Sequence, residues 1–174
     1  MELSPAPFFE DVAGGPADGQ AHWLMTSDQK RIRVGHWRPG GRAHGTVMVF
    51  PGRTEYIEKY GNTAQEFVNR GFAVLAVDWR GQGLADRLLE NPRIGHVDHF
   101  TDYQHDVQAT LDLADALDLP KPWYVVGHSM GGAIGLRAVI EKGCFAACAF
   151  TGPMWGIFFT PVMKPLSRVT AYWG

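Results

Sequence analysis

Four short apolar segments dominate the pattern of this sequence, and stretches with helical spacing separate them. The segments are residues 46–50, 73–77, 123–126 and 146–150. Nearly continuous apolar runs of this length are typical of strands that are buried on both faces of a parallel sheet. Because parallel strands need long crossover connections, the alternation predicts an α/β domain with a mostly parallel sheet and helices on both faces.

The first and third crossovers carry clear helix signals. Residues 60–68 place apolar side chains along one face of a helix, which we expect to end before Gly71. The third helix is predicted from residue 130 to about residue 142, followed by Gly143 as the helix-ending residue. Both helices have the length that a right-handed crossover between parallel strands requires.

The second crossover is predicted as a helix that follows Asp98. Thr101 and Gln104 have the spacing of a capping box, and Pro120 ends the pattern. The apolar face of this helix consists of Tyr103, Val107, Leu111, Ala114 and Leu117.

The first part of the chain has a different pattern. Residues 22–26 and 31–37 favour two short strands, and the polar residues 27–29 between them suit a hairpin turn. We therefore expect an antiparallel hairpin at the start of the sheet, preceded by an N-terminal extension over residues 1–20.

Charge and size limit the functions that the chain can have. Its 174 residues match the usual size of one domain. Sixteen Lys and Arg against 18 Asp and Glu give a formal net charge of −2 at pH 7, so the basic excess of nucleic-acid-binding proteins is missing. We expect no nucleic-acid partner.

The two cysteines, Cys144 and Cys148, lie in one apolar segment. They are too few for a framework of several disulfides or a four-cysteine metal site, so we expect small core residues in a reducing compartment, with no metal and no organic cofactor. The alternative is that an exposed edge makes their thiols reactive. Residues 1–20 contain no basic side chain and no continuous apolar core, which argues against a signal peptide. The predicted location is the cytoplasm.

The strongest chemical signal is the hexapeptide Gly127-His128-Ser129-Met130-Gly131-Gly132, which follows the apolar run 123–126. In a G-x-S-x-G sequence between a strand and a helix, a sharp turn exposes the serine hydroxyl, and small neighbours let strand and helix approach. The pattern indicates Ser129 as a nucleophile, with Gly127 and Gly131 shaping the turn and the Met130 N–H as one oxyanion donor. The alternative is a glycine-rich turn whose serine only caps a helix.

A second oxyanion donor is expected in the loop after an earlier strand. Pro51, Gly52 and Arg53 follow the apolar run 46–50. Gly52 gives the backbone the freedom to turn the Arg53 N–H inward, opposite the Met130 N–H. The Arg53 side chain either faces solvent or meets an anionic head group, and we favour the first.

From about residue 20 onward the chain resembles the α/β-hydrolase fold, in particular its monoacylglycerol-lipase and lysophospholipase branch, which is related to serine aminopeptidases. The residues that carry the resemblance are the elbow 127–132, the loop 51–60 with its trailing Lys59 and Tyr60, the turn 78–83 of the form Asp-x-Arg-Gly-x-Gly, and the helix entry 95–106. Pro51 and Thr54 depart from the branch, which has His and Gly there. Asp78 and Arg80 are expected to fix their turn without touching substrate.

The resemblance implies a serine hydrolase of carboxylic esters that forms an acyl-enzyme on Ser129, with a lysophospholipid or a monoacylglycerol as the small lipid substrate. In this family the triad runs Ser, then Asp or Glu, then His. After Ser129 the only acid is Glu141 and no His follows; His96 and His99 are weaker candidates for the base. We therefore expect an N-terminal portion of such an enzyme, truncated before its last strands, with little or no turnover alone.

The resemblance divides the chain into an incomplete hydrolase core over residues 21–153 and the start of an apolar lid or cap over residues 154–174. Residues 144–163 carry no formal charge, but Pro153 and Pro161 argue against a membrane-spanning helix. Peripheral contact of the apolar C-terminal segment with a membrane is compatible with this pattern.

Two other functions fit the same residues. The first is a non-catalytic domain that kept the fold and binds a lipid or a protein partner through its apolar C-terminal segment. The second is a peptidase of the related aminopeptidase branch, for which a site for a free amine is not evident in the sequence.

Overall fold

The structure, a computed structural model, describes residues 4–156. These residues form a seven-stranded sheet in the order β1-β2-β3-β5-β4-β6-β7. The strands are β1 (Ser4–Ala6), β2 (Gln20–Met25), β3 (Arg31–Trp37), β4 (Thr46–Phe50), β5 (Ala73–Asp78), β6 (Trp123–His128) and β7 (Phe145–Thr151). From β5 through β4 and β6 to β7 the pairing is parallel, whereas β2 and β3 form an antiparallel hairpin and β3 is antiparallel to β5. The predicted mostly parallel sheet and the antiparallel hairpin are confirmed.

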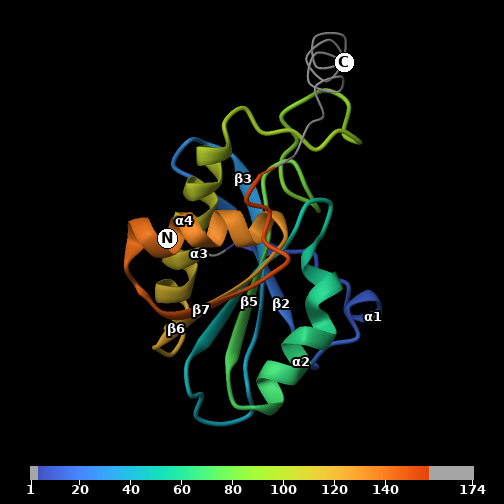
Figure 1. The fold of residues 1–174 in the computed structure, drawn as a ribbon. Helices are drawn as coiled ribbons and strands as arrows, with labels where there is room; N and C mark the ends of the chain where they lie inside the picture. The colour runs from blue at the N-terminus through green and yellow to red at the C-terminus, as the bar shows by residue number, and fades with distance from the viewer. Residues whose placement is uncertain (1–3, 157–174) are drawn as a thin grey trace.

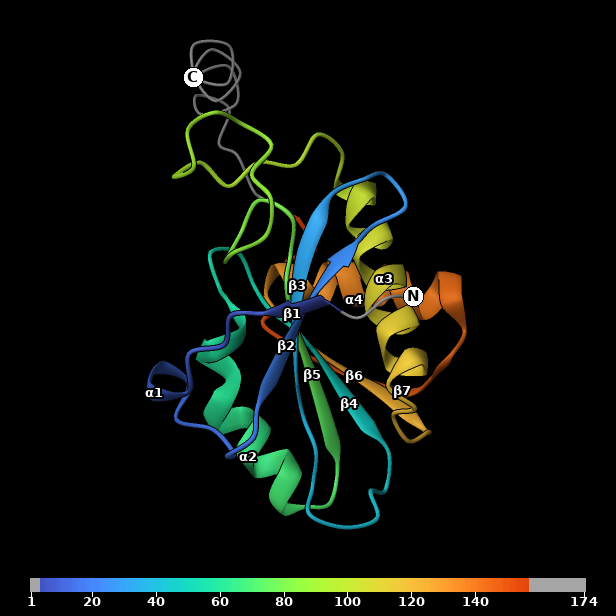
Figure 2. The same cartoon turned by 180° about the vertical axis from the view of Figure 1, so that it is seen from behind.

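Helices cover both faces of this sheet, as expected (Figures 1 and 2). On one face lies α2 (Gly61–Asn69), preceded by the short 3₁₀ helix η1 (Ile57–Tyr60). On the other face lie α3 (Tyr103–Ala116) and α4 (Met130–Lys142). Gly143 ends α4 with a φ of 61°, the left-handed conformation that glycine adopts easily.

The predicted capping box of α3 is wrong. The chain enters this helix through the 3₁₀ turn η2 (Phe100–Asp102), so the first turn begins earlier than the apolar spacing indicates. The Asp102 carboxylate accepts the N–H of His99 at 3.1 Å, while Gln104 donates to the Ile134 carbonyl on α4 at 3.2 Å. Gln104 therefore joins two helices and caps neither.

The N-terminal residues contribute to the sheet. Strand β1 pairs antiparallel with β2, with Pro5 opposite His22, and the short helix α1 (Glu10–Ala13) packs against η1. Gly61, which follows η1 and begins α2, allows the end of α1 to approach closely, because a Cβ at Gly61 would lie 2.1 Å from the Ala13 carbonyl oxygen. A three-residue strand that contains proline has no periodicity from which it could be predicted.

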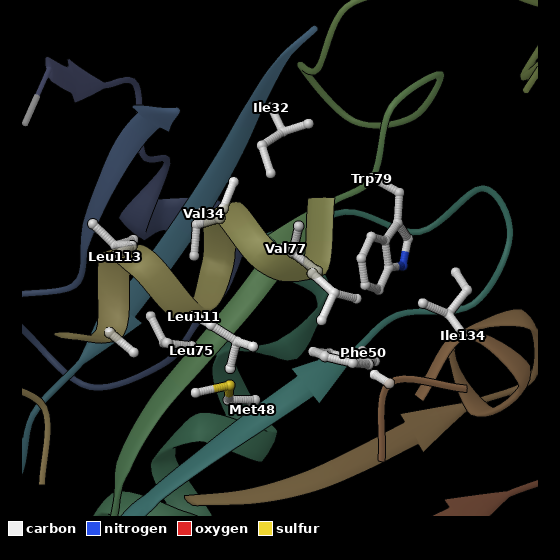
Figure 3. Close-up of a cluster of buried hydrophobic side chains, with 14 of the residues drawn as sticks. Ile32, Val34, Met48, Phe50, Leu75, Val77, Trp79, Leu111, Leu113 and Ile134 are labelled. Atoms are coloured by element: carbon white, nitrogen blue, oxygen red, sulfur yellow. The ribbon is translucent and has the colours of Figure 1, made fainter. Parts of the chain in front are cut away.

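The main core fills the space between the sheet and the helices α3 and α4 (Figure 3). Phe50 is the last residue of β4, and Trp79 directly follows β5. Their rings meet edge to face, with the centroids 5.1 Å apart. The Trp79 indole also donates to the Pro51 carbonyl at 2.9 Å. This contact anchors the loop that follows β4 to the core.

Strand β7 differs from its prediction. It is last in the strand order, and in the described part of the chain its only strand neighbour is β6. Five of its seven residues are exposed, so burial on both faces is wrong for residues 146–150. Cys144 and Cys148 are likewise exposed free thiols, because no other described element covers this edge, and they are not core residues.

The segment predicted as a lid is described only at its start. Met154 packs against the core cluster, and the Trp155 ring meets Phe150 edge to face at 6.0 Å. Residues 157–174 lie outside the described residues, and the prediction for them is not tested. None of the helices within residues 4–156 is long and apolar enough to span a membrane.

Candidate active site

Ser129 occupies the sharp turn that joins β6 to α4. Its backbone has φ 50° and ψ −116°, a conformation that residues with a side chain seldom adopt. Three backbone hydrogen bonds hold it: the Ser129 N–H donates to the Thr151 carbonyl at 3.0 Å, and the Ser129 carbonyl accepts from Gly132 at 3.0 Å and Met154 at 2.9 Å. The side chain is partly exposed, so the hydroxyl is accessible beyond the end of the sheet.

The glycines of the elbow allow close backbone contacts. A Cβ at Gly131 would lie 1.9 Å from the Phe50 carbonyl oxygen, and one at Gly127 would lie 2.8 Å from the Gly131 carbonyl oxygen. Real Cβ atoms do not approach backbone oxygens so closely. The start of α4 can therefore pack on the end of β4 only because both positions lack a side chain.

The loop after β4 lies directly against the serine. A Cβ at Gly52 would be 3.2 Å from the Ser129 Cβ. The N–H groups on either side of Arg53 are both occupied, since Gly52 donates to Glu55 at 2.5 Å and Thr54 donates to Gln82 at 2.8 Å. Within residues 4–156 the Arg53 N–H has no acceptor, nor has that of Met130. The structure thus leaves the N–H groups of both expected donor residues without an acceptor in the described residues, and Gly52, the neighbour of Arg53, lies against Ser129.

Glu55 is a buried carboxylate that fixes the shape of this loop. It accepts hydrogen bonds from the Gly52 N–H and the Tyr60 hydroxyl, each at 2.5 Å, and it pairs with Lys59. Burial raises the pKa of Glu55, but the hydrogen bonds from Lys59, Tyr60 and Gly52 outweigh burial and bring the pKa below its ordinary value. These residues belong to the sequence motif 51–60, but their role in holding the loop was not predicted. The spacing of Glu55 and Lys59 at i and i+4 could have indicated it.

Gln82 is a second side chain that holds this loop by hydrogen bonds, and its role was not predicted from the sequence. Its side chain accepts the Thr54 N–H at 2.8 Å and donates to the Gly52 carbonyl at 3.2 Å. Thr54 has a φ of 63°, which a β-branched residue adopts only at a cost in energy. The position at which the chain departs from the glycine of the related branch is therefore held in a glycine-like conformation, and Gln82 supports it.

The turn after β5 supplies Gln82 and is itself fixed by Asp78, as expected. The Asp78 carboxylate accepts the N–H groups of Leu84 and Ile57, each at 2.8 Å, and a hydrogen bond from Arg33 at 2.8 Å. Arg80 is buried and pairs with Asp28 and Asp106. Neither Asp78 nor Arg80 contacts Ser129 through any hydrogen bond in residues 4–156, and the prediction that they fix the turn is confirmed.

A family model described as "Serine aminopeptidase, S33" matches residues 41–173, about three quarters of the chain. The chain belongs to the S33 family. Two relatives of this S33 chain carry the names of the lipase and lysophospholipase branch that the sequence motifs resemble. It is 43% identical over 115 residues to lysophospholipase L2 of Escherichia coli, covering 64% of this chain and 33% of the relative. It is 32% identical over 146 residues to the monoacylglycerol lipase of Mycolicibacterium smegmatis, covering 80% and 49%.

Solved structures show the α/β-hydrolase fold of the S33 chain independently of sequence. The complex of DcsB with its substrate analogue superimposes with a TM-score of 0.73 at 19% identity, covering 89% of this chain and 52% of the other. A monoglyceride lipase of Saccharomyces cerevisiae, in complex with a substrate analog, gives 0.62 at 22% identity, covering 98% and 50%. The S33 chain therefore spans from about a third to about a half of the length of these relatives.

None of the histidines in residues 4–156 forms a hydrogen bond to the Ser129 side chain. His96 bonds Asp98 at 3.1 Å, and the His128 ring points to the Thr151 hydroxyl at 2.9 Å. His99 lies exposed at the start of η2. No hydrogen bond within residues 4–156 joins an imidazole to the Ser129 hydroxyl, so the structure brings neither of the two candidate bases to the serine.

Proposed function

We propose that Ser129 is the nucleophile of a serine hydrolase that cleaves carboxylic esters of small lipids, such as a lysophospholipid or a monoacylglycerol. The observation that carries the proposal is the strained backbone of Ser129, which lies at the start of α4 and next to the loop at Gly52. Strained residues at a strand-to-helix turn are typical of nucleophiles that must be exposed. The names of the S33 relatives support a lipid ester as substrate.

In the proposed reaction the Ser129 Oγ attacks the ester carbonyl carbon, and the hydroxyl proton passes to a general base. The negative charge that develops on the carbonyl oxygen is stabilised by the N–H groups of Met130 and Arg53, aided by the N-terminal end of α4. The alcohol leaves with a proton, which gives an acyl-enzyme. Water then attacks the acyl-enzyme, and release of the fatty acid restores Ser129.

We infer that the general base and its acid partner are contributed by residues outside these 174. The chain has no His after Ser129, and Glu141 is its only later acid. A base must come within hydrogen-bond distance of the hydroxyl in the reacting complex. For this reason the proposal includes slow turnover, or none, by the 174-residue chain.

The test uses a fluorophosphonate probe and a chromogenic short-chain ester on the 174-residue chain and on the native protein purified from its source, whose intact mass is measured first. We expect the native protein to be labelled and active, and Ser129→Ala to abolish both signals. The matched control is Ser27→Ala, a serine in the β2–β3 turn. Labelling of the native protein that survives Ser129→Ala would refute the nucleophile. Ser129-dependent turnover by the 174-residue chain at the rate of the native protein would refute an external base.

A second candidate function, binding of lipid without catalysis, is favoured by one observation. An open groove of about 540 Å³ runs along α4, lined mainly by apolar side chains such as Leu136, Ile140 and Trp155. Binding of the chain to phosphatidylcholine vesicles, without esterase activity in the native protein, would favour this function. Ile140→Ser should weaken such binding because Ile140 is 73% exposed.

A further inference from the structure

A second, polar hollow lies on the other side of the loop that contacts Ser129. Its volume is about 430 Å³. Thr54 and Tyr56 line it from the segment after β4, Gln82 from the turn after β5, and Arg87 and Arg93 from the segment that leads to α3. In Figure 1 this last segment, drawn in green to yellow, extends beyond the end of the sheet.

Three guanidinium groups surround this hollow without a carboxylate to balance them. Arg87 and Arg93 line it, and Arg53 reaches its rim by donating to the Gly95 carbonyl at 3.0 Å. Among residues 4–156 none of the three forms an ion pair, although Arg31, Arg33, Arg70, Arg80 and Arg137 all do. Residues 157–174 contain no Asp or Glu, and residues 1–3 contain only Glu2.

Unpaired arginines around a polar hollow favour an oxyanion that can accept several hydrogen bonds. Phosphate meets this requirement, because its oxygens accept in pairs from the planar guanidinium group. The Thr54 and Tyr56 side chains add hydroxyl groups to the same lining. A neutral glycerol group would leave the positive charge unbalanced.

The hollow and Ser129 lie against the same loop, because Thr54 lines the hollow and Gly52 lies next to Ser129. Gln82, which lines the hollow, donates to the Gly52 carbonyl at 3.2 Å, and a Cβ on Gly52 would lie 3.2 Å from the Ser129 Cβ. The loop at Gly52 thus lies between the two places. In a monoacyl glycerophospholipid, the glycerol unit likewise separates the ester carbonyl from the phosphate.

We propose that the hollow between Arg53, Arg87 and Arg93 is a phosphate subsite, which makes the substrate class of Ser129 a lysophospholipid and not a neutral monoacylglycerol. The assignment to a substrate rests on the function proposed above, whereas the subsite itself can be tested without catalysis. Phosphate could also come from a free ion, so the experiment compares a head group with the ion.

The experiment measures binding of sn-glycerol 3-phosphate, inorganic phosphate and glycerol by calorimetry or by NMR titration of the arginine side-chain N–H signals, at low salt. We expect sn-glycerol 3-phosphate to bind more tightly than inorganic phosphate, and glycerol not to bind. Arg93→Gln should weaken binding by about tenfold or more, the effect of losing a charge-assisted hydrogen bond. Ser129→Ala should bind like the native chain, which separates this test from that of the nucleophile.

Two comparisons keep the result interpretable. Arg87 donates to the Gly83 carbonyl at 2.8 Å, so Arg87→Gln can disturb the turn, whereas the Arg93 side chain makes no hydrogen bond in residues 4–156. Arg93→Gln is therefore the decisive variant, and Arg70→Gln, on the exposed face of α2, is its matched control. Equal affinity for both phosphates would overturn the assignment to a head group. Absence of binding, or equal loss in Arg93→Gln and Arg70→Gln, would overturn the subsite.

Discussion

Strands β5 and β7 are both apolar in sequence but differ in how far their residues are buried. Ala73–Asp78 and Phe145–Thr151 are both short apolar runs that lead to a turn. Every residue of β5 is buried, between β3 and β4 in the sheet, whereas most of β7 is exposed at the edge. The apolar pattern therefore indicates where a strand forms, whereas the elements packed against the strand determine how much stability the strand contributes.

The difference extends to the polar groups beside these two strands. Beside β5, the Arg33 guanidinium lies 1% exposed and pairs with Glu58 and Asp78 at 2.8 Å. Beside β7, the described polar contacts are exposed, such as that of His128 with Thr151. Buried ion pairs contribute strongly only while both partners are present, so the loops braced from β5 depend on an intact network.

The largest effect is expected from removing the centre of that network. Arg33→Ala should lower the free energy of unfolding by about 3–5 kcal/mol, because the carboxylates of Glu58 and Asp78 would remain buried without a positively charged partner. Urea denaturation measures the change. The matched control is Arg70→Ala, whose partner Glu66 is exposed; its expected cost is below about 1 kcal/mol. Similar losses in both variants would remove the distinction between the two regions.

The second prediction concerns pH. His22 and His36 stack between β2 and β3 with ring centroids 5.3 Å apart, and both are buried. Burial, with the nearby charges of His22 and Arg38, lowers the pKa of His36 to about 4. The unfolded chain therefore binds a proton near pH 6.5 and the folded chain near pH 4, so stability falls as pH decreases through this interval, by up to about 3 kcal/mol.

Urea denaturation at several pH values checks this sign. His36→Gln should flatten the dependence between pH 6.5 and pH 4 relative to the native chain, because no imidazole remains to be charged at this position. The variant also shows how much of the loss comes from carboxylates elsewhere. An unchanged slope would mean that the histidine pair contributes nothing to it.

The smallest effect is expected at the exposed edge. Cys148→Ala on β7 should change the free energy of unfolding by less than about 0.5 kcal/mol, whereas Leu75→Ala on β5 should cost about 2–5 kcal/mol. In the folded chain both thiols should react with a disulfide reagent. Burial raises the pKa of Cys144, so its reaction at neutral pH should be slower than in the unfolded chain. Protection of Cys148 in the folded chain would show that β7 is covered.

Much of the fold and part of the candidate site follow from the sequence. Ser129 and Gly131 could be predicted because a strand, a G-x-S-x-G sequence and a helix follow one another within a few residues. Glu55 and Gln82 could not be assigned their roles, since each acts by bonding backbone groups of a loop whose path is not local information. The three arginines of the proposed phosphate subsite lie up to 40 residues apart, and no spacing rule joins them.

The alternation of strands and helices, the hairpin and the position of the elbow follow from local sequence, because apolar periodicity and turn residues act over a few neighbouring positions. The folded arrangement fixes which apolar run lies at the edge, which polar groups are buried in pairs and which stay unpaired. These properties depend on contacts between residues far apart in the chain. Burial and charge balance are sums over such contacts, so they exist only once the chain has folded.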